Sequence, residues 1–151
     1  MRYDNQQLAD YVKHSRRRLA ELQEKYSAHQ GTDATLAGFI YIGRAILTAV
    51  ASWTRVQLLN TQFSDGSSPD FSGRAWGSGL GVGTSWGGGA FSEPGSQLGG
   101  HASIRIAMAP SSVEILIWDG GDPIGVFTGS GIDISAFCGS GKGSGTGMWA
   151  Q

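Results

Sequence analysis

The stretch that decides the fold is Phe71-Ser-Gly-Arg-Ala-Trp-Gly-Ser-Gly-Leu-Gly-Val-Gly-Thr84. From Gly73 to Gly83 every odd position is glycine or alanine, whereas the even positions carry larger side chains. Successive side chains of a strand point to opposite faces, so one face of this stretch would be almost bare backbone. Glycine weakens a strand unless a neighbour approaches its backbone closely or the sheet bends sharply. The stretch therefore predicts a strand in a tightly curled β structure.

The same glycine phase returns near the C-terminus, where alternate positions from Gly139 to Gly147 are glycine. A flexible linker has no reason to keep glycine in phase twice. We therefore expect close packing at seven glycines of the two stretches, namely Gly77, Gly79, Gly81, Gly83, Gly141, Gly143 and Gly145. Bulky side chains should fill the space opposite them, and the candidates are Trp53, Trp118, Phe127 and Phe137.

Residues 5–29 have the pattern of an amphipathic helix. A narrow apolar seam recurs at spacings of three and four, with a serine in the missing register: Leu8, Val12, Ser15, Leu19, Leu22 and Tyr26. The other face is charged, and its candidates for contact with a partner are Arg16, Arg17 and Arg18. The pattern leaves open whether this helix packs on its own domain, pairs with a second copy in a homodimer, or lies on a membrane.

The middle of the chain fits more than one structure. Apolar residues over 33–48 fit a helix face, and alternation from about 50 to 62 favours a strand. We therefore expect a helix followed by a strand. A transmembrane span over 36–53 is the alternative, but Arg44 lies at its centre, so burial in a protein core is favoured.

Residues beyond 70 have the pattern of short strands separated by turns. Asp119-Gly-Gly-Asp122 is the best hairpin signal, because Asp-Gly suits a type I′ turn. Strands are expected near 71–77, 79–86, 88–92, 101–108, 113–118, 123–129, 132–138 and 139–149.

These patterns together predict a mainly β fold. It is a small antiparallel β-barrel of about eight strands, preceded by one or two N-terminal α-helices, because closing such a sheet removes its exposed edges. We divide the chain into an N-terminal amphipathic helix, 1–32, and a glycine-rich barrel domain with a leading helix, 33–151.

Composition excludes several classes of protein. The formal net charge is −1 and charged residues make up 15% of the chain, so there is no electrostatic footprint for nucleic acid. The single cysteine, Cys138, excludes an internal disulfide framework. No secretory signal peptide is visible. The chain would be cytosolic, exported by another route, or a mature form.

No constellation of residues indicates catalysis. The segment around Gly141-Lys142-Gly143 departs from a phosphate-binding loop, because Gly143 stands where Ser or Thr would hold magnesium. The three histidines are scattered, so neither a metal site nor a cofactor is expected. Cys138 with His29 or His101 could form a nucleophile and base, but a small core residue is favoured at Cys138.

An apolar stripe is the remaining candidate for a binding surface. Trp76, Leu80 and Val82 alternate along one face of the first glycine stretch. Such a stripe is a half-buried part of the sheet or a contact for a partner or lipid, and the sequence favours the first.

Three segments share the glycine pattern of a known family. They are the run from Phe71 to Gly87, which ends in Ser-Trp-Gly, the segment Ile124-Gly-Val-Phe-Thr-Gly129, and the run from Gly139 to Gly147. Through them, residues 35–147 resemble the virulence-associated proteins (Vap family) of pathogenic actinobacteria. The resemblance implies a compact antiparallel barrel of about eight strands with a helix, preceded by a less ordered N-terminal region. It also implies secretion, no enzymatic site, and a role in persistence inside host phagocytes through effects on host membranes.

We therefore expect a non-enzymatic interaction protein that acts on a host or competitor surface, with membrane lipid or a protein of that surface as its partner and no nucleic acid. Two alternatives stay open: a small toxin or effector delivered by a contact-dependent secretion apparatus, and a hydrolase that uses Cys138. Secretion follows from the resemblance alone, and a cytoplasmic location is the alternative.

Overall fold

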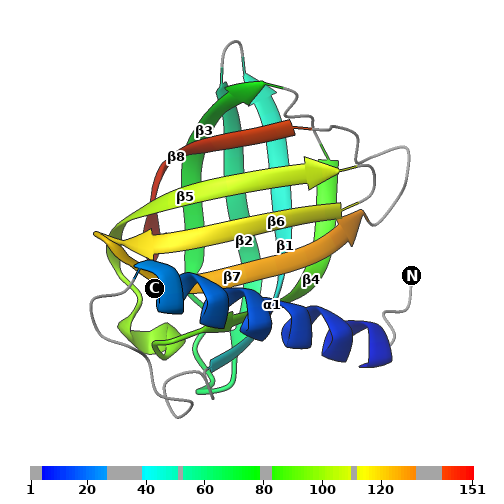
Figure 1. The fold of residues 1–151 in the computed structure, drawn as a ribbon, viewed down its shortest axis with the longest axis vertical. Helices are drawn as coiled ribbons and strands as arrows, with labels where there is room; N and C mark the ends of the chain where they lie inside the picture. The colour runs from blue at the N-terminus through cyan, green and yellow to red at the C-terminus, as the bar shows by residue number, and fades with distance from the viewer. Residues whose placement is uncertain (1–4, 27–38, 51–52, 79–82, 110–111, 132–140) are drawn as a thin grey trace.

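The computed structural model of the chain describes residues 5–26, 39–50, 53–78, 83–109, 112–131 and 141–151. They form one α-helix, α1 (Asn5–Tyr26), one 3₁₀ turn, η1 (Gly95–Gln97), and eight β-strands (Figure 1). The strands are β1 (Phe39–Val50), β2 (Trp53–Phe63), β3 (Asp70–Ser78), β4 (Gly83–Phe91), β5 (Gly100–Ala109), β6 (Ser112–Asp119), β7 (Asp122–Gly131) and β8 (Gly141–Ala150).

The eight strands close into a barrel in the order β1-β2-β3-β8-β5-β6-β7-β4, and β4 pairs back with β1. Every neighbouring pair is antiparallel. Closure gives each described strand a neighbour on both sides, which removes the unpaired edges that would recruit other chains. The predicted mainly β, antiparallel, eight-stranded fold behind an N-terminal helix is confirmed.

The two glycine-phased strands, β3 and β8, are neighbours in the barrel. Their register sets Gly77 opposite Gly143, and Ala75 opposite Gly145. A Cβ added at Gly77 or Gly145 would come closer than 3.0 Å to backbone atoms of the facing strand, a separation that real Cβ atoms essentially never show. At these two positions, the lack of a side chain allows the strands to approach this closely.

Of the other predicted close-packing glycines, Gly143 faces Gly77, and the rest lie at strand ends or outside the described residues. Gly83 begins β4 and pairs with Leu47 of β1. Gly141 begins β8 and pairs with Met108 of β5. The predictions for Gly79 and Gly81 fall outside the described part of the chain.

Aromatic side chains fill part of the barrel interior. Phe71, Phe91 and Trp149 are buried there. The ring centroid of Trp149 lies 5.1 Å from that of Phe71 and 5.7 Å from that of Phe91. Phe63 extends this group, with its ring 5.2 Å from the Phe91 ring.

The aromatic residues predicted to face the glycines are only partly right. Phe127 is buried in the interior, but the side chain that lies against Gly73 and Gly147 is that of Phe71. Trp118 instead packs on the outer face, in a cluster with residues of α1. Trp53 also departs from the prediction, because its half-buried ring lies against the exposed Arg74 side chain. Strand alternation decided these two orientations, and it overrode side-chain size. Phe137 lies outside the described residues.

The helix predicted over 33–48 is wrong for its described part, because Phe39–Val50 forms strand β1. β1 pairs along both of its edges, with β2 and with β4. Its many β-branched and aromatic side chains favour a strand, although their spacing also fits a helix face. Pairing on both sides decided between the two, since barrel closure requires a strand here.

The remaining strand predictions have mixed outcomes. The strand expected at 50–62 is β2. The two strands expected at 79–86 and 88–92 form one strand, β4, over their described residues. The strand expected at 132–138 falls outside the described residues.

The hairpin predicted at Asp119–Asp122 is confirmed, because Asp119, the last residue of β6, pairs with Asp122, the first residue of β7. Gly120 has a φ of 60°, whereas Gly121 has no φ in the left-handed region. A type I′ turn requires positive φ at both central residues. The predicted turn type is therefore wrong, although the loop has the predicted position.

Helix α1 lies across the outside of the barrel and contacts β7 and β4 (Figure 1). Its buried residues are Val12, Ser15, Leu19 and Leu22 of the predicted seam, together with Gln23. Leu19 and Leu22 form one apolar cluster with four residues of the barrel surface, which are Ala90, Leu116, Trp118 and Val126. The helix therefore packs on its own barrel.

A serine stands where this seam lacks an apolar residue. The Ser15 hydroxyl hydrogen-bonds to the carbonyl oxygen of Gly88 over 3.1 Å and to Thr128 Oγ1 over 2.9 Å. Burial of a hydroxyl costs free energy unless it is hydrogen-bonded, and the Ser15 hydroxyl is hydrogen-bonded.

Among the described residues, no helix is long and apolar enough to cross a membrane.

Candidate functional site

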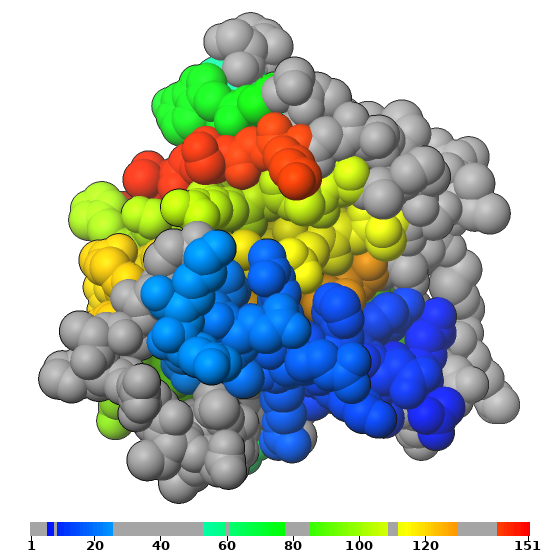
Figure 2. Space-filling view, in the orientation of Figure 1, coloured from blue at the N-terminus to red at the C-terminus, as the bar shows by residue number. Residues whose placement is uncertain are grey.

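The outer faces of four adjacent strands, β2, β3, β8 and β5, lie beside the part of the barrel that α1 contacts. In Figure 2, β3 (green), β8 (red) and β5 (yellow-green) are uncovered above the helix. Side chains on these strands alternate between buried and exposed, as in β3, where Phe71 and Ala75 are buried and Arg74 and Trp76 are exposed.

The exposed side chains of these strands combine positive charge with large apolar groups. We name this set the basic face, and it consists of Arg55, Arg74, Trp76, His101, Arg105, Lys142 and Met148. In the four strands as the structure describes them, the one acidic residue is Asp70, at the first position of β3. The basic face is thus positive, although the chain has a net charge of −1.

Strand register brings these residues together from distant parts of the sequence. Ser144 of β8 pairs with Trp76 on one side and with Arg105 on the other. In the next outward-facing row, Arg74 pairs with both Arg55 and Thr146. In these two rows the outward residues of β8, Ser144 and Thr146, are short and carry hydroxyl groups, and longer side chains of β3 and β5 lie beside them.

Two arginines of the basic face lie against indole rings. The guanidinium carbon of Arg74 is 4.6 Å from the centroid of the Trp53 ring, and that of Arg105 is 4.9 Å from the Trp118 ring. Stacking of this kind is attractive and restricts the arginine side chain. It leaves the N–H groups at the guanidinium edge available to hydrogen-bond an anion.

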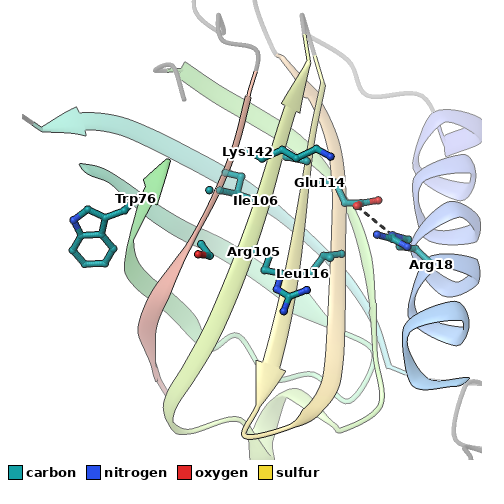
Figure 3. Close-up of a pocket in the computed structure, with 10 residues that line it drawn as sticks. Arg18, Trp76, Arg105, Ile106, Glu114, Leu116 and Lys142 are labelled. Carbon is teal, nitrogen blue, oxygen red and sulfur yellow. Dashed lines mark hydrogen bonds and ion pairs between the residues drawn. The ribbon is translucent and has the colours of Figure 1, made fainter. Parts of the chain in front are cut away.

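Trp76 separates two hollows on this face. The first, which we name the helix-side hollow, has a volume of about 560 Å³ and extends from Trp76 to α1. Its charged lining residues are Arg18, Arg105, Glu114 and Lys142. Figure 3 shows Trp76 and Arg18 at opposite ends of this hollow.

The second, the histidine-side hollow, has a volume of about 480 Å³. Its lining includes Arg55, Arg74 and His101, together with Trp76 and Met148. No carboxylate is among the described residues that line it. Cations and hydroxyl groups beside two apolar side chains suit an anionic group attached to an apolar body.

The predicted contact residues are separated by the fold. Trp76 lies at the centre of the basic face and has 49% of its surface exposed. Arg16, Arg17 and Arg18 lie on α1, and of the three only Arg18 lines the helix-side hollow. Leu80 and Val82, the other members of the predicted apolar stripe, lie outside the described residues.

Sequence reasoning missed the other members of the basic face. Arg55, Arg105 and Met148 share no local motif with Trp76. The available signal was strand alternation, which places Arg74 and Trp76, or Lys142 and Met148, on one face of a strand. Only the strand order around β8 shows that these faces adjoin.

The residues considered for catalysis fall mostly outside the described part of the chain. Neither Cys138 nor His29 belongs to the described residues, and His101 lies on the basic face. Within the described ranges, no group of three or more His, Cys, Asp or Glu side chains could hold a metal ion.

Among the described residues, two carboxyl groups have shifted pKa values, and neither lines the two hollows. A hydrogen bond from the Ser67 hydroxyl holds the pKa of Asp65 well below its usual range. Burial raises the pKa of Glu93, and the negative charge of Asp119 raises it further.

Comparison with known proteins places the fold. No family model matches the chain, and no curated protein matches it. Among solved structures, the chain is similar to the virulence-associated protein VapD of the intracellular pathogen Rhodococcus equi, at 20% identity and a TM-score of 0.63, over 75% of this chain and 99% of that chain. It is also similar to VapB of the same organism, at 20% identity and a TM-score of 0.56, over 74% of this chain and 96% of that chain.

The match shows that the chain has the fold of these virulence-associated proteins. The resemblance to the Vap family that the glycine pattern predicted is therefore confirmed at the level of the fold. Nearly all of VapD is matched, whereas a quarter of this chain lies outside the match.

Proposed function

We propose that this chain is a non-enzymatic, virulence-associated interaction protein that is exported and acts on the membrane of a host or competitor cell. Its basic face is the binding surface, and anionic lipid is the partner. One observation carries the proposal: the two large apolar side chains most exposed among the described residues, Trp76 (49%) and Met148 (50%), lie on the same face as Arg55, Arg74, Arg105 and Lys142.

This combination suits a membrane interface. Tryptophan is enriched at the boundary between headgroups and acyl chains, because its ring is apolar and its N–H is polar. Each Lys or Arg near an anionic membrane surface contributes about 1 kcal/mol. The face spans four of the eight strands of a closed barrel, so a flat surface would contact its middle, on β3 and β8, with the side chains of β2 and β5 at the edges of the contact.

The solved structures with this fold give the biological setting of the proposal. Both are described as virulence-associated proteins of an intracellular pathogen. Extending that role, and the export that goes with it, to this chain rests on the shared fold.

Co-sedimentation with lipid vesicles tests the proposal. The full chain should bind vesicles of equal parts phosphatidylserine and phosphatidylcholine, and should not bind vesicles of phosphatidylcholine alone. Replacing two cations of the face, Arg74→Gln with Lys142→Gln, should weaken binding roughly thirtyfold, because about 2 kcal/mol is lost.

The matched control removes the same charge elsewhere. Arg17→Gln with Lys13→Gln neutralises two exposed cations of α1 that line neither hollow of the basic face. This variant should bind within about threefold of the parent, since screening limits distant charges. Absence of binding by the parent chain, or equal losses in the two variants, would contradict the proposal.

A further inference from the structure

Glu114 is the one acidic residue among the described residues that line the helix-side hollow. It lies on β6, and the other charged groups that line this hollow are Arg18, Arg105 and Lys142. A carboxylate in this position would repel the anion that the three cations attract. The charge of Glu114 therefore matters for what the hollow can bind.

Both oxygens of the Glu114 carboxylate face helix α1. Arg18 Nε donates a hydrogen bond to Oε1 over 3.3 Å, and His14 Nε2 lies 3.4 Å from Oε2. The Glu114 side chain is 24% exposed and that of Arg18 is 36% exposed, so solvent screens this ion pair only in part. Figure 3 shows the Arg18 side chain reaching from α1 to Glu114.

Arg18 also lines the hollow, so it has two effects on the binding site. It adds a cation to the lining, and it compensates the carboxylate that opposes anions. If α1 left the barrel, the hollow would lose Arg18 and expose an uncompensated Glu114 at the same time. Release of the helix would thus lower the formal charge of this lining from +2 to +1, and it would free the Glu114 carboxylate from the Arg18 hydrogen bond that holds it toward α1.

We propose that helix α1 completes the anion-binding hollow and regulates it: Arg18 supplies one cation and neutralises Glu114, so the basic face binds anionic headgroups strongly only with α1 docked. This inference rests on the proposed function of the basic face. Linkage is reciprocal, so an anionic surface bound in the hollow stabilises the docked helix in return.

A double-mutant cycle on vesicles of equal parts phosphatidylserine and phosphatidylcholine tests the inference. Arg18→Gln should weaken binding about twenty-five-fold, roughly fivefold for the lost cation and about fivefold for the exposed carboxylate. In a chain that also carries Glu114→Gln, Arg18→Gln should cost only about fivefold, because no carboxylate is left to expose. Arg17→Gln, one residue earlier on the same helix, is the matched control and should change binding less than about twofold.

Hydrogen exchange of the full chain gives the second readout. Anionic vesicles should slow exchange of the α1 amides in the parent, and should not do so in Arg18→Gln. Circular dichroism and a thermal melt check that each variant folds. Equal losses from Arg18→Gln with and without Glu114→Gln would overturn the linkage, as would α1 exchange that vesicles leave unchanged.

The possible failures are distinguishable. A parent chain that binds no anionic vesicle would overturn the proposed function, and the regulation with it. A parent that binds, loses affinity on Arg74→Gln with Lys142→Gln, and yet treats Arg18→Gln like Arg17→Gln, would retain the basic face as the binding surface and overturn the role of α1.

Discussion

At Gly145 the packing partner is the backbone of the neighbouring strand. An added Cβ there would clash with the carbonyl oxygen of Arg74 and lie 2.9 Å from the Cα of Ala75. Backbone atoms of a paired strand cannot move aside as a flexible side chain can. Gly145→Ala should therefore lower the free energy of unfolding by about 3 kcal/mol, at the upper end of the usual cost of overpacking. Urea denaturation followed by circular dichroism measures this loss.

Gly121 provides the matched control for that substitution. A Cβ added at Gly121 would have no heavy atom within 4 Å, and its φ is not in the left-handed region. Gly121→Ala should leave the free energy of unfolding within about 0.5 kcal/mol of the parent. If Gly145→Ala were as stable as Gly121→Ala, the glycine phase would not reflect close packing of β3 and β8.

Glu93 predicts a pH dependence of stability. Burial, with the charge of Asp119, raises the pKa of Glu93 above its ordinary value of 4.5 in the folded protein. The folded state then holds the proton more tightly than the unfolded state. Its contribution to stability is fully present below pH 4.5 and is lost as pH rises through the higher folded pKa. Glu93→Gln cannot ionise, so it should have a higher Tm than the parent at pH 7.

Thermal melts across pH check this effect. The gain in Tm from Glu93→Gln should shrink as pH falls toward 4.5 and vanish below it. Glu24→Gln removes a carboxylate at an exposed position of α1 and is the control, so its Tm should stay close to that of the parent. A Glu93→Gln advantage that grows at acidic pH would contradict the direction of the shift.

At the scale of elements, α1 was predictable because its seam is local. The spacing of Val12, Leu19 and Leu22 shows one apolar face, and the structure buries that face. β1 was not predictable, because Phe39–Val50 satisfies helix and strand patterns equally. What decided it was pairing with β4, about forty residues later in the chain, and no local propensity carries that information.

The docking of α1 gives a prediction at the same scale. Leu19 is 1% exposed and lies in the cluster that joins the helix to the barrel. Leu19→Ala should weaken docking by about 2–5 kcal/mol, the usual cost of truncating a buried leucine. Hydrogen exchange should then show faster exchange of the α1 amides, with little change in the β5 and β8 amides.

A control on the exposed side of the same helix separates docking from helix propensity. Lys13→Ala changes an exposed residue and should leave α1 protection close to that of the parent. Loss of barrel protection together with that of α1 in Leu19→Ala would show instead that helix and barrel unfold as one unit.

Across the whole molecule, the basic face depends on strand order and not on any motif. Trp76, Lys142 and Arg105 adjoin because β8, the last strand in sequence, inserts between β3 and β5. The sequence identified Trp76 from its phase alone, and the glycine pattern identified the barrel. The sequence could not predict that β8 lies between β3 and β5. These strands are far apart in the chain, and no local pattern indicates which strands pair when the barrel closes.

Charge asymmetry of the whole molecule underlies the last prediction. With a net charge of −1, the chain would not bind an anionic membrane if its charges were evenly spread. Because the cations gather on four strands, binding should weaken steadily with salt, as the Debye length falls below about 10 Å beyond 0.1 M. Arg74→Gln with Lys142→Gln should flatten this salt dependence.

Trp76→Ser should weaken binding about tenfold at every salt concentration and keep the slope, because it removes apolar contact and no charge. Vesicle co-sedimentation over a salt series measures both, and a Trp76→Ser variant that lost the salt slope would contradict the division of the face into charged and apolar contributions.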